Sequence, residues 1–375
     1  MARSFSSCIG LLVVFGLAFM FTAADATAKP PANRWVDHWQ ATTRQWRALH
    51  ISSPAPNKIA ETEKFVRDIL APMGINVLIL EVNYGFEFAS HPELGCHGIT
   101  KAQARHLADV CHRGGIRLIP LFNCLGHQSW AKNTQPLLKV YRQFDEAPDV
   151  PLDNKGIYCR EWCPSEPKVY DVVFDLIDEL IDAFDADAVH VGMDEVFLIG
   201  KKGCPRCQGK DVAALFASVV NRLHQHIVRE KKLEMLMWGD RLLDAKVMGY
   251  GKWESSETGS SGAIDRIPKD IIICDWHYPK RADYPSVRYF QKKGFRVLPA
   301  TWKTPDAAVA LIQCAQHDPT DRMLGILFTG WSCGSGGAQL MQALVQPNAN
   351  RDPKNTGARV AATIRAGLRA LKTAR

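Results

Sequence analysis

The sequence predicts an α/β fold in which strand–helix units close a single-domain (β/α)₈ barrel of the TIM type. Eight short apolar runs follow one another along the chain, and such nearly continuous runs are typical of parallel strands buried on both faces. Amphipathic stretches of helical length separate most of these runs. The length of 375 residues suits one large α/β domain, and no linker divides it. An open, doubly wound sheet is the alternative topology.

The order of the elements follows from these patterns. The expected strands are residues 47–53, 76–83, 116–123, 188–195, 234–240, 270–277, 296–302 and 325–331. The expected helices are residues 57–74, 100–115, 165–184, 210–232, 284–294, 304–317 and 355–375. Glycine, the residue expected just past a helix C-terminus, ends several of them, as at Gly74 and Gly294. The connection 241–269 is rich in Gly and Ser and is expected to be mostly loop.

Composition and charge exclude some classes of function. Hydrophobic residues make up 46% of the chain and charged residues 23%, as in soluble globular proteins. The formal net charge of +7 is spread along the sequence, and the densest basic run is Arg229, Lys231 and Lys232 at the end of an expected helix. Because cations favour helix C-termini, this run indicates a solvated helix end. No nucleic-acid partner is therefore predicted.

The N-terminus predicts export to the periplasm or to the outside of the cell. Arg3 precedes a long apolar run and then the small residues ADATA, which is the pattern of a secretory signal peptide. We expect cleavage after Ala26 or Ala28, so that residues 1–28 are removed and residues 29–375 form the mature domain. A retained membrane anchor is the alternative, because the run approaches spanning length. No later segment is apolar enough to span a bilayer, so no stable membrane insertion is expected after cleavage.

Polar and aromatic side chains end most of the expected strands. In a (β/α)₈ barrel the carboxyl ends of the strands meet on one face, where active sites lie. The residues at these ends are Asn83, Asn123, Asp194, Glu195, Trp238, Asp240, Asp275, Trp276, His277, Tyr278, Trp302 and Trp331. Helix capping explains one Asp or Asn at such a place, but not six or seven strands that end this way. Aromatic walls around carboxylates suit an uncharged ring with hydroxyls, so we expect a glycan or glycoconjugate substrate.

The segment VHVGMDEV at residues 189–196 carries a resemblance to a known family. It resembles the signature of family 20 glycoside hydrolases, the β-N-acetylhexosaminidases, in which a His-x-Gly-Gly-Asp-Glu run ends the fourth barrel strand. The matching residues are His190, Gly192, Asp194 and Glu195. Met193 stands where the family has its second Gly. The resemblance covers the barrel, about residues 44–345.

Further residues are similar to the same family and occur in the same order along the barrel. Gly126 and His127 resemble the Pro-Gly-His segment after the third strand. Trp238 and Trp331 resemble tryptophans that wall the sugar pocket. Arg47 resembles the sugar-binding Arg of the first strand.

The resemblance implies an exported hydrolase that cleaves terminal β-linked N-acetylhexosamine, GlcNAc or GalNAc, with retention and without a cofactor. In this family the 2-acetamido oxygen of the substrate attacks the anomeric carbon and forms an oxazolinium ion. Glu195 would be the general acid and then the base for water. Asp194 would orient the acetamido group and stabilise the developing positive charge. His127 would relay to the general acid, although a surface histidine at a loop turn is the alternative.

A set of side chains is predicted to bind the sugar, from the strand ends and from the resemblance. Its members are Arg47, Asn83, His190, Trp238, Asp240, Trp276, Tyr278, Trp302 and Trp331. For His190 a hydrogen-bonded position in the core is the favoured alternative. Asn83 departs from the family, which has Asp there, and the segment around Trp302 lacks the tyrosine that contacts the acetamido oxygen. Tyr278 could supply that hydroxyl from the neighbouring strand.

Two other functions are compatible with the pattern. One is a retaining glycosidase that forms a covalent intermediate on another sugar, with its second carboxylate at Asp240 or Asp275. The other is a catalytically silent barrel that binds glycans. Adjacent carboxylates argue against the first, because the covalent scheme needs carboxylates on separate strands. The presence of both Asp194 and Glu195 argues against the second.

Four cysteines with short spacings lie in loops that we expect to be neighbours. Cys159 and Cys163 follow the third strand, and Cys204 and Cys207 follow the fourth. Such C-x₃-C and C-x₂-C pairs could form a closed structural zinc site. In an exported protein cross-loop disulfides are the first expectation, zinc is the second, and free thiols are the third. Either link would brace the loop that holds Glu195, but four thiolates would leave no open position for a catalytic zinc.

Overall fold

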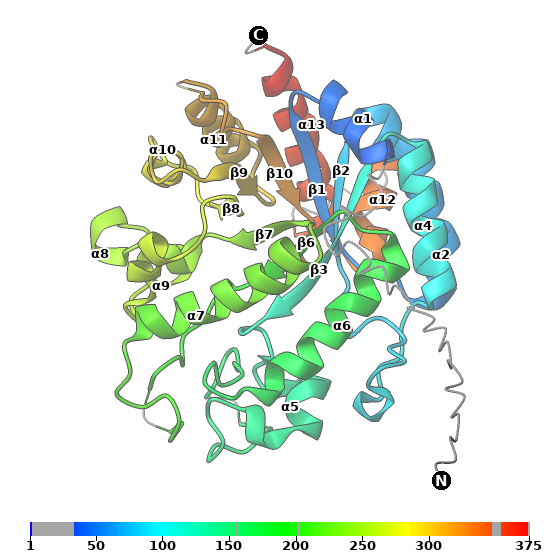
Figure 1. Cartoon of the computed structure of the whole chain (residues 1–375). Coiled ribbons are helices and arrows are strands. Elements are labelled where there is room, and N and C mark those ends of the chain that lie inside the picture. Colours follow the sequence, from blue (N-terminus) through cyan, green and yellow to red (C-terminus); the bar gives the residue numbers. More distant parts are fainter. Residues whose placement is uncertain (2–33, 155, 202, 318, 347–353, 374–375) are drawn as a thin grey trace. The chain divides into compact units, whose positions relative to one another are not determined.

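Eight parallel strands close into a barrel in the structure of the protein, a computed structural model (Figure 1). It describes residue 1 and residues 34–373, apart from residues 155, 202, 318 and 347–353. The expected signal peptide at residues 1–28 lies outside the described residues. The described residues from Arg34 onward belong to one compact unit. The predicted single-domain (β/α)₈ barrel is therefore confirmed.

Each barrel strand lies where an apolar run predicts it. The strands are β1 (Trp46–Ser52), β2 (Val77–Glu81), β3 (Arg117–Cys124), β6 (Ala188–Gly192), β7 (Glu234–Trp238), β8 (Ile272–Trp276), β9 (Arg296–Thr301) and β10 (Gly325–Thr329). Successive strands pair in parallel, and β10 returns to pair with β1 and close the sheet. A short hairpin of β4 (Ser129–Trp130) and β5 (Asn133–Thr134), which the sequence does not predict, lies in the connection after β3.

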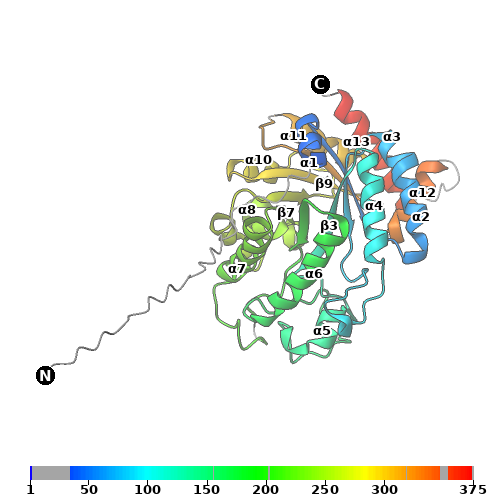
Figure 2. The same cartoon turned by 45° about the vertical axis from the view of Figure 1, so that its right-hand side comes forward.

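Helices surround the barrel, and the main ones lie in the stretches with helical periodicity. The helices are α1 (Arg34–Thr42), α2 (Ile59–Phe65), α3 (Ala71–Met73), α4 (Lys101–Arg113), α5 (Pro136–Val140), α6 (Lys168–Phe184), α7 (Val212–His224), α8 (Ala245–Met248), α9 (Gly251–Glu254), α10 (Pro285–Lys292), α11 (Pro305–His317), α12 (Ala338–Val345) and α13 (Thr356–Thr373). A π-helical turn, Val66–Leu70, joins α2 to α3, and another, Gln225–Glu230, extends α7. In both views α4 and α6 lie side by side on the outside of the barrel (Figure 2).

Local sequence explains where several helices begin. Thr100 and Gln103 form a capping box at the start of α4, and the Asp211 side chain accepts a hydrogen bond from the backbone at the start of α7. The connection 241–269 differs from the predicted loop, because it holds α8, α9 and a 3₁₀ helix at Ser260–Arg266. The cause is again a cap, since Asp244 accepts hydrogen bonds from two backbone amides of α8.

The interior of the barrel is packed with side chains. Its buried members include Ala48, Ile79, Ile119, Leu121, Leu236, Ile272, Leu298 and Leu327. A second, larger cluster fills the layer between the strands and the helices. Layers of branched side chains inside such a barrel form a core and leave no pore along its axis.

The amino-terminal end of the barrel is closed by α1 and a buried arginine. In both views α1 lies at the opposite end of the barrel from α5 (Figures 1 and 2). The Arg117 guanidinium is fully buried and lies over the rings of Trp39 and Trp46, at 5.4 and 5.3 Å from their centroids. It also pairs with Asp187 and, at 2.7 Å, with Glu234. The N-terminal mouth of the barrel is thus sealed by aromatic rings and paired charges.

Within the part of the chain that the structure describes, none of the helices has the length and apolar character needed to cross a membrane.

We expect Arg117→Met to lower the free energy of unfolding by about 3 kcal/mol, because it leaves two carboxylates in a poorly solvated place with one cation fewer. This is the lower end of the range for a broken buried pair, since Asp187 and Glu234 keep 15% and 23% side-chain exposure. Urea unfolding followed by tryptophan fluorescence measures the change. Arg105→Met is the matched control, because Arg105 also meets two carboxylates, Asp182 and Asp185, but at the surface. Arg105→Met should change the free energy of unfolding by less than about 1 kcal/mol. Equal losses in both variants would show that Arg117 does not stabilise the closed end of the barrel.

Candidate active site

A cavity of about 450 Å³ opens at the carboxyl ends of the barrel strands. Its lining residues are Glu81, Asn123, His127, Trp130, Tyr158, Asp194, Glu195, Trp238, Trp276, Tyr278, Trp302, Trp331 and Ser332. This volume is in the range of small-molecule sites, roughly 300–1,000 Å³. The cavity brings together the three predicted catalytic residues and five of the predicted sugar-binding residues. Arg47, Asn83, His190 and Asp240 are not part of its lining.

An unusual backbone turn lets both carboxylates face this cavity. Strand β6 ends at Gly192, and Met193 and Glu195 then adopt left-handed conformations with φ of 75° and 51°. Such angles are rare for residues other than glycine and cost roughly 1–2 kcal/mol each. Strain of this kind is concentrated at functional sites. The turn breaks the strict alternation of strand side chains, so Asp194 and Glu195 line the same cavity.

The loop after β3 packs directly on this turn. A Cβ atom at Gly126 would lie 2.6 Å from the backbone oxygen of Asp194, so only glycine fits there. The next residue, His127, has a left-handed backbone with φ of 56°. Its Nε2 lies 3.0 Å from Asp194 Oδ2 and 3.4 Å from Glu195 Oε2. The close approach at Gly126 thus brings the imidazole between the two carboxylates.

The three groups take different ionisation states. Burial opposes a charge on His127, but the nearby Asp194 carboxylate raises the pKa of His127 well above its usual value. Burial likewise opposes the charge of Asp194, yet its pKa is lowered because His127 lies against it. Burial and the Asp194 charge together raise the pKa of Glu195 to about 7. The site therefore holds an imidazolium–carboxylate pair beside a carboxyl group that keeps its proton up to about pH 7.

Asp240 does not line the cavity, in contrast to its predicted role in sugar binding. Its Oδ2 accepts a hydrogen bond of 3.0 Å from the backbone N–H of Glu195 and one of 2.6 Å from Arg241. The Arg241 guanidinium also donates to the backbone oxygens of Lys252 and Ser255. Asp240 is therefore a positioning residue, which fixes the backbone of Glu195 from behind the site.

Glu81, rather than Asn83, is the polar residue of β2 that lines the cavity. Glu81 is the last residue of the strand, and Asn83 lies beyond it with a left-handed φ of 45°. The Asn83 amide donates to Glu81 at 2.9 Å, and its Oδ1 accepts from the backbone of Asn123 at 2.8 Å. The Asn123 side chain also donates to Glu81. Asn83 thus orients two residues of the cavity without lining it.

Arg47 lies away from the cavity, in contrast to its predicted role in sugar binding. It is the second residue of β1 and therefore belongs to the amino-terminal half of the strand, whereas the cavity lies at the carboxyl ends. Its guanidinium donates to the backbone oxygen of Gly74. The prediction that Arg47 binds substrate is not met by this geometry.

His190 occupies a core position, as the alternative interpretation of this residue holds. Its Nδ1 accepts a hydrogen bond of 3.1 Å from the backbone of Gly192, and its ring packs against Trp238 with 4.6 Å between centroids. Burial lowers the pKa of His190 to about 3, so its ring is neutral. It supports the tryptophan wall from inside the barrel.

Aromatic side chains form a continuous wall around the carboxylates. Tyr278 packs against Trp276 and Trp302, with ring centroids 4.9 and 5.4 Å apart. The Trp331 indole donates a hydrogen bond of 2.6 Å to the Tyr278 hydroxyl, and its ring lies 5.9 Å from that of Trp238. This wall consists of residues that the strand ends predict. Trp130, Tyr158 and Ser332 also line the cavity, but Trp130 belongs to the short hairpin after β3 and the other two lie in loops, so none of them ends a predicted barrel strand.

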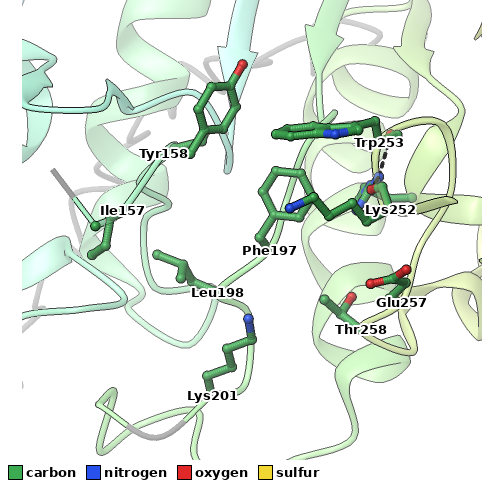
Figure 3. Close-up of a pocket in the computed structure, with 12 residues that line it drawn as sticks. Ile157, Tyr158, Phe197, Leu198, Lys201, Lys252, Trp253, Glu257 and Thr258 are labelled. Atoms are coloured by element: carbon green, nitrogen blue, oxygen red, sulfur yellow. Dashed lines mark hydrogen bonds between the residues drawn. The ribbon is translucent and has the colours of Figure 1, made fainter.

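A second cavity of about 430 Å³ adjoins the first and shares Tyr158 with it. Figure 3 shows Tyr158, Phe197 and Trp253 around its upper part, with Lys201 and Glu257 further down. The rings of these three aromatic residues contact one another edge to face, with 5.2 Å between Tyr158 and Trp253. This surface offers apolar faces for a second sugar or another group attached to the first.

The four predicted cysteines do not all meet. Cys163, Cys204 and Cys207 lie together and are joined by the Glu146 carboxylate. Cys159 instead lies beside the active site, where its sulfur accepts a hydrogen bond of 2.7 Å from the backbone of His127. The structure therefore corrects the predicted set at Cys159, because the loop turns between the two cysteines of the C-x₃-C pair.

Comparisons with known proteins agree with the family resemblance that the sequence carries. The model of the family described as "Glycosyl hydrolase family 20, catalytic domain" matches residues 60–304. Hexosaminidase D of Bos taurus is 22% identical over 314 residues, which are 76% of this chain and 84% of that protein.

Solved structures share the fold. A β-N-acetylhexosaminidase superposes with a TM-score of 0.61 at 17% identity, over 88% of this chain and 76% of that one. The exo β-N-acetylglucosaminidase of Vibrio harveyi, solved in complex with N-acetylglucosamine, superposes with a TM-score of 0.56 at 15% identity. That match covers 88% of this chain and 58% of the Vibrio chain.

The family model covers more than half of the chain, and the Asp194–Glu195 pair follows the end of the fourth barrel strand, β6. We conclude that this protein belongs to glycosyl hydrolase family 20 and is a glycosidase of the β-N-acetylhexosaminidase type.

Proposed function

We propose that the protein is an exported exo-enzyme that cleaves terminal β-linked N-acetylhexosamine, GlcNAc or GalNAc, from glycans by substrate assistance. The observation that carries this proposal is the pair of adjacent carboxyl groups with opposite ionisation in one cavity. Glu195 is protonated near neutrality, and Asp194 is held as an anion by His127. Residues 1–28 act as the signal peptide in this proposal, and N-terminal sequencing of the exported protein tests that cleavage.

Glu195 and Asp194 divide the chemistry between them. Glu195 protonates the glycosidic oxygen as the bond to the aglycone breaks, and afterwards takes a proton from the attacking water. Asp194 Oδ1 is buried in the cavity wall and has no hydrogen-bond partner among the described residues, so it is available to the acetamido N–H of a substrate. Its charge stabilises the positive charge of the oxazolinium intermediate. These steps use groups of the protein and the substrate alone, without a cofactor.

The aromatic wall binds the sugar ring and positions its acetamido group. The apolar faces of Trp238, Trp276 and Trp331 exclude water from the reacting centre. The Tyr278 hydroxyl, which accepts from Trp331, keeps its own proton to donate to the acetamido oxygen. In this proposal the aglycone leaves across Tyr158, Phe197 and Trp253.

A retaining mechanism with a covalent intermediate is the second candidate, and Glu81 is the observation that favours it. Asp275 is engaged by His277 and Ser286, and neither Asp275 nor Asp240 lines the cavity. Glu81 does line it and is the carboxylate that this mechanism would use. Trapping of a 2-fluoro sugar on Glu81 would establish that mechanism.

The enzyme should depend on the 2-acetamido group. We expect cleavage of aryl β-N-acetylglucosaminide or β-N-acetylgalactosaminide but not of the aryl β-glucoside, and strong inhibition by a thiazoline that mimics the oxazolinium ion. Asp194→Asn should slow cleavage about 10²–10³-fold and weaken the thiazoline, because a charge-assisted hydrogen bond is lost. Steady-state kinetics and inhibition constants measure both effects. Efficient cleavage of the glucoside would sink the proposal.

Glu195→Gln should lower turnover about 10²–10⁴-fold on substrates with poor leaving groups, because proton transfer to the leaving oxygen is lost. The loss should shrink for nitrophenyl glycosides, which need little protonation. A leaving-group series in kcat/KM measures this dependence. Glu61→Gln, the same substitution at an exposed position of the outer helix α2, is the control and should leave the series unchanged. A small, uniform loss in Glu195→Gln would exclude this residue as the acid.

The pH profile of kcat/KM should fall on its basic side near pH 7, because deprotonation of Glu195 removes the acid. The Tyr158 hydroxyl forms a hydrogen bond with Glu195 and lowers the pKa of Glu195. Tyr158→Phe should therefore raise the pKa of Glu195 and move the basic limb of the profile to higher pH. Tyr84→Phe is the control, because the Tyr84 hydroxyl donates to Gln128 instead. The idea fails if both variants keep the wild-type limb or if the limb moves to lower pH in Tyr158→Phe.

A further inference from the structure

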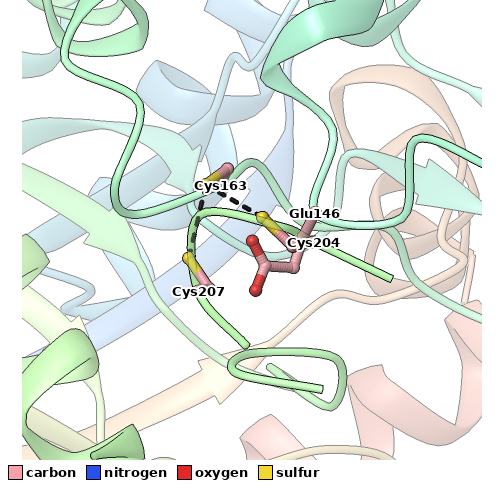
Figure 4. A group of neighbouring side chains, drawn as sticks. All are labelled: Glu146, Cys163, Cys204 and Cys207. Carbon is pink, nitrogen blue, oxygen red and sulfur yellow. Dashed lines mark hydrogen bonds between the residues drawn. The ribbon is translucent and has the colours of Figure 1, made fainter. Parts of the chain in front are cut away.

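Three thiols and a carboxylate meet outside the active site. Glu146 and Cys163 come from the connection between β3 and α6, and Cys204 and Cys207 from the connection between β6 and α7. One ligand atom from each lies within 4.8 Å of the others (Figure 4). The three cysteines are fully buried and Glu146 is 2% exposed. Two loops that are distant in sequence therefore present a closed set of metal-binding atoms.

The spacing suits a tetrahedral metal better than a disulfide. Cys163 Sγ lies 3.3 Å from both Cys204 Sγ and Cys207 Sγ, whereas a disulfide needs about 2.05 Å. A tetrahedral zinc ion with Zn–S bonds of about 2.3 Å and a Zn–O bond of about 2.1 Å separates its ligands by roughly 3.6–3.8 Å. A disulfide would also involve only two of the three thiols, and it would leave the third thiol and the buried carboxylate without a partner in this group.

Glu146 adds an independent observation. Its Oε1 accepts a hydrogen bond of 3.0 Å from the backbone of Gly200. Its Oε2 is buried and meets no nitrogen or oxygen donor among the described residues, and one oxygen of this carboxylate lies in the group with the three sulfurs. A buried carboxylate oxygen in this position is expensive unless a cation or a proton meets it.

The surroundings suit a single metal ion with anionic sulfur ligands. The Arg206 guanidinium donates a hydrogen bond of 3.2 Å to Cys163 Sγ. Backbone bonds from Cys207 and Gln208 to the Cys204 oxygen, of 3.2 and 3.0 Å, form the tight turn that brings the two cysteines of the C-x₂-C pair together. Donors around the sulfurs and a tight turn are typical of the outer shell of a zinc–thiolate site.

We infer that Glu146, Cys163, Cys204 and Cys207 bind one zinc ion as a closed structural site. Thiolate-rich ligand sets with a single oxygen favour zinc over magnesium or calcium. Binding displaces the protons of the three thiols, and that of Glu146 where it is protonated. With four protein ligands the ion has no open position and takes no part in bond cleavage.

The zinc would brace the catalytic turn. Glu161, two residues before Cys163, accepts hydrogen bonds from the backbone amides of Phe197 and Leu198, just after Glu195. The backbone oxygen of Glu161 accepts one of 3.0 Å from Glu146. A metal ion bound by Cys163, Cys204 and Cys207 therefore links the segment that carries Glu161 to the segment that carries Phe197 and Leu198.

Metal analysis of the purified, untagged protein tests the site independently of its activity. We expect one zinc ion per chain, lost in Cys204→Ala and kept in Cys111→Ala, which removes a buried thiol of α4 as a matched control. Cobalt in place of zinc should give the intense sulfur-to-cobalt charge-transfer absorption and the visible bands of a tetrahedral thiolate site. Glu146→Gln should keep that absorption but weaken zinc binding at least about tenfold.

Extraction of zinc from the wild-type protein covers the case in which Cys204→Ala does not fold. Chelation should release the metal, expose three further thiols to titration and lower the thermal midpoint, and added zinc should restore it. A disulfide between Cys163 and either Cys204 or Cys207 in the native protein, mapped by mass spectrometry, would overturn the inference. Failure of the protein to take up zinc or cobalt with its thiols reduced would overturn it as well.

Discussion

The contact between the loop after β3 and the turn after β6 is the constraint on which the active site depends. Gly126 allows the two backbones to approach, and His127 then lies between Asp194 and Glu195. The imidazolium lies closest to Asp194 and holds that carboxyl group ionised, while burial and the Asp194 charge raise the pKa of Glu195. Two adjacent residues of one strand end thus acquire different chemistry from a neighbouring loop.

A layer of buried and half-buried polar groups behind the cavity holds this arrangement. Asp240 fixes the backbone of Glu195, Asn83 orients Glu81, and Glu161 bonds the segment that follows Glu195. None of these three lines the cavity. Left-handed residues such as Met193 raise the energy of the turn, and these hydrogen bonds offset that strain. The reacting groups are therefore positioned by side chains that do not meet the substrate.

The sequence predicts the barrel well because each strand carries a continuous apolar run and each main helix an amphipathic period. It also predicts the aromatic wall, since those side chains are the last residues of strands or follow them directly. It fails where position depends on the path of a loop. Tyr158 and Trp130 reach the cavity from the connection after β3, and Cys159 turns away from Cys163 within the same connection.

Strand ends are a second source of error, because one or two residues decide which side chain faces the cavity. Glu81 ends β2 and Asn83 lies beyond a left-handed turn, although both stand at the end of one apolar run. Arg47 matches a family motif by residue type, but it stands near the start of its strand. Periodicity gives the strand and its approximate end, whereas the backbone angles that direct the final side chain depend on neighbours distant in sequence.

The sealed amino-terminal end has a consequence for the order of events during turnover. Because Arg117, Trp39 and Trp46 close that end and branched side chains fill the barrel, the cavity does not open through the described barrel to its amino-terminal side. In the proposed mechanism water then reaches the intermediate from the carboxyl-terminal side of the barrel, which is also the side on which the aglycone departs. An alcohol resting on Tyr158, Phe197 and Trp253 lies on that side and competes with water for the anomeric carbon. The same architecture that makes a hydrolase thus gives it an inherent capacity for glycosyl transfer at high acceptor concentration.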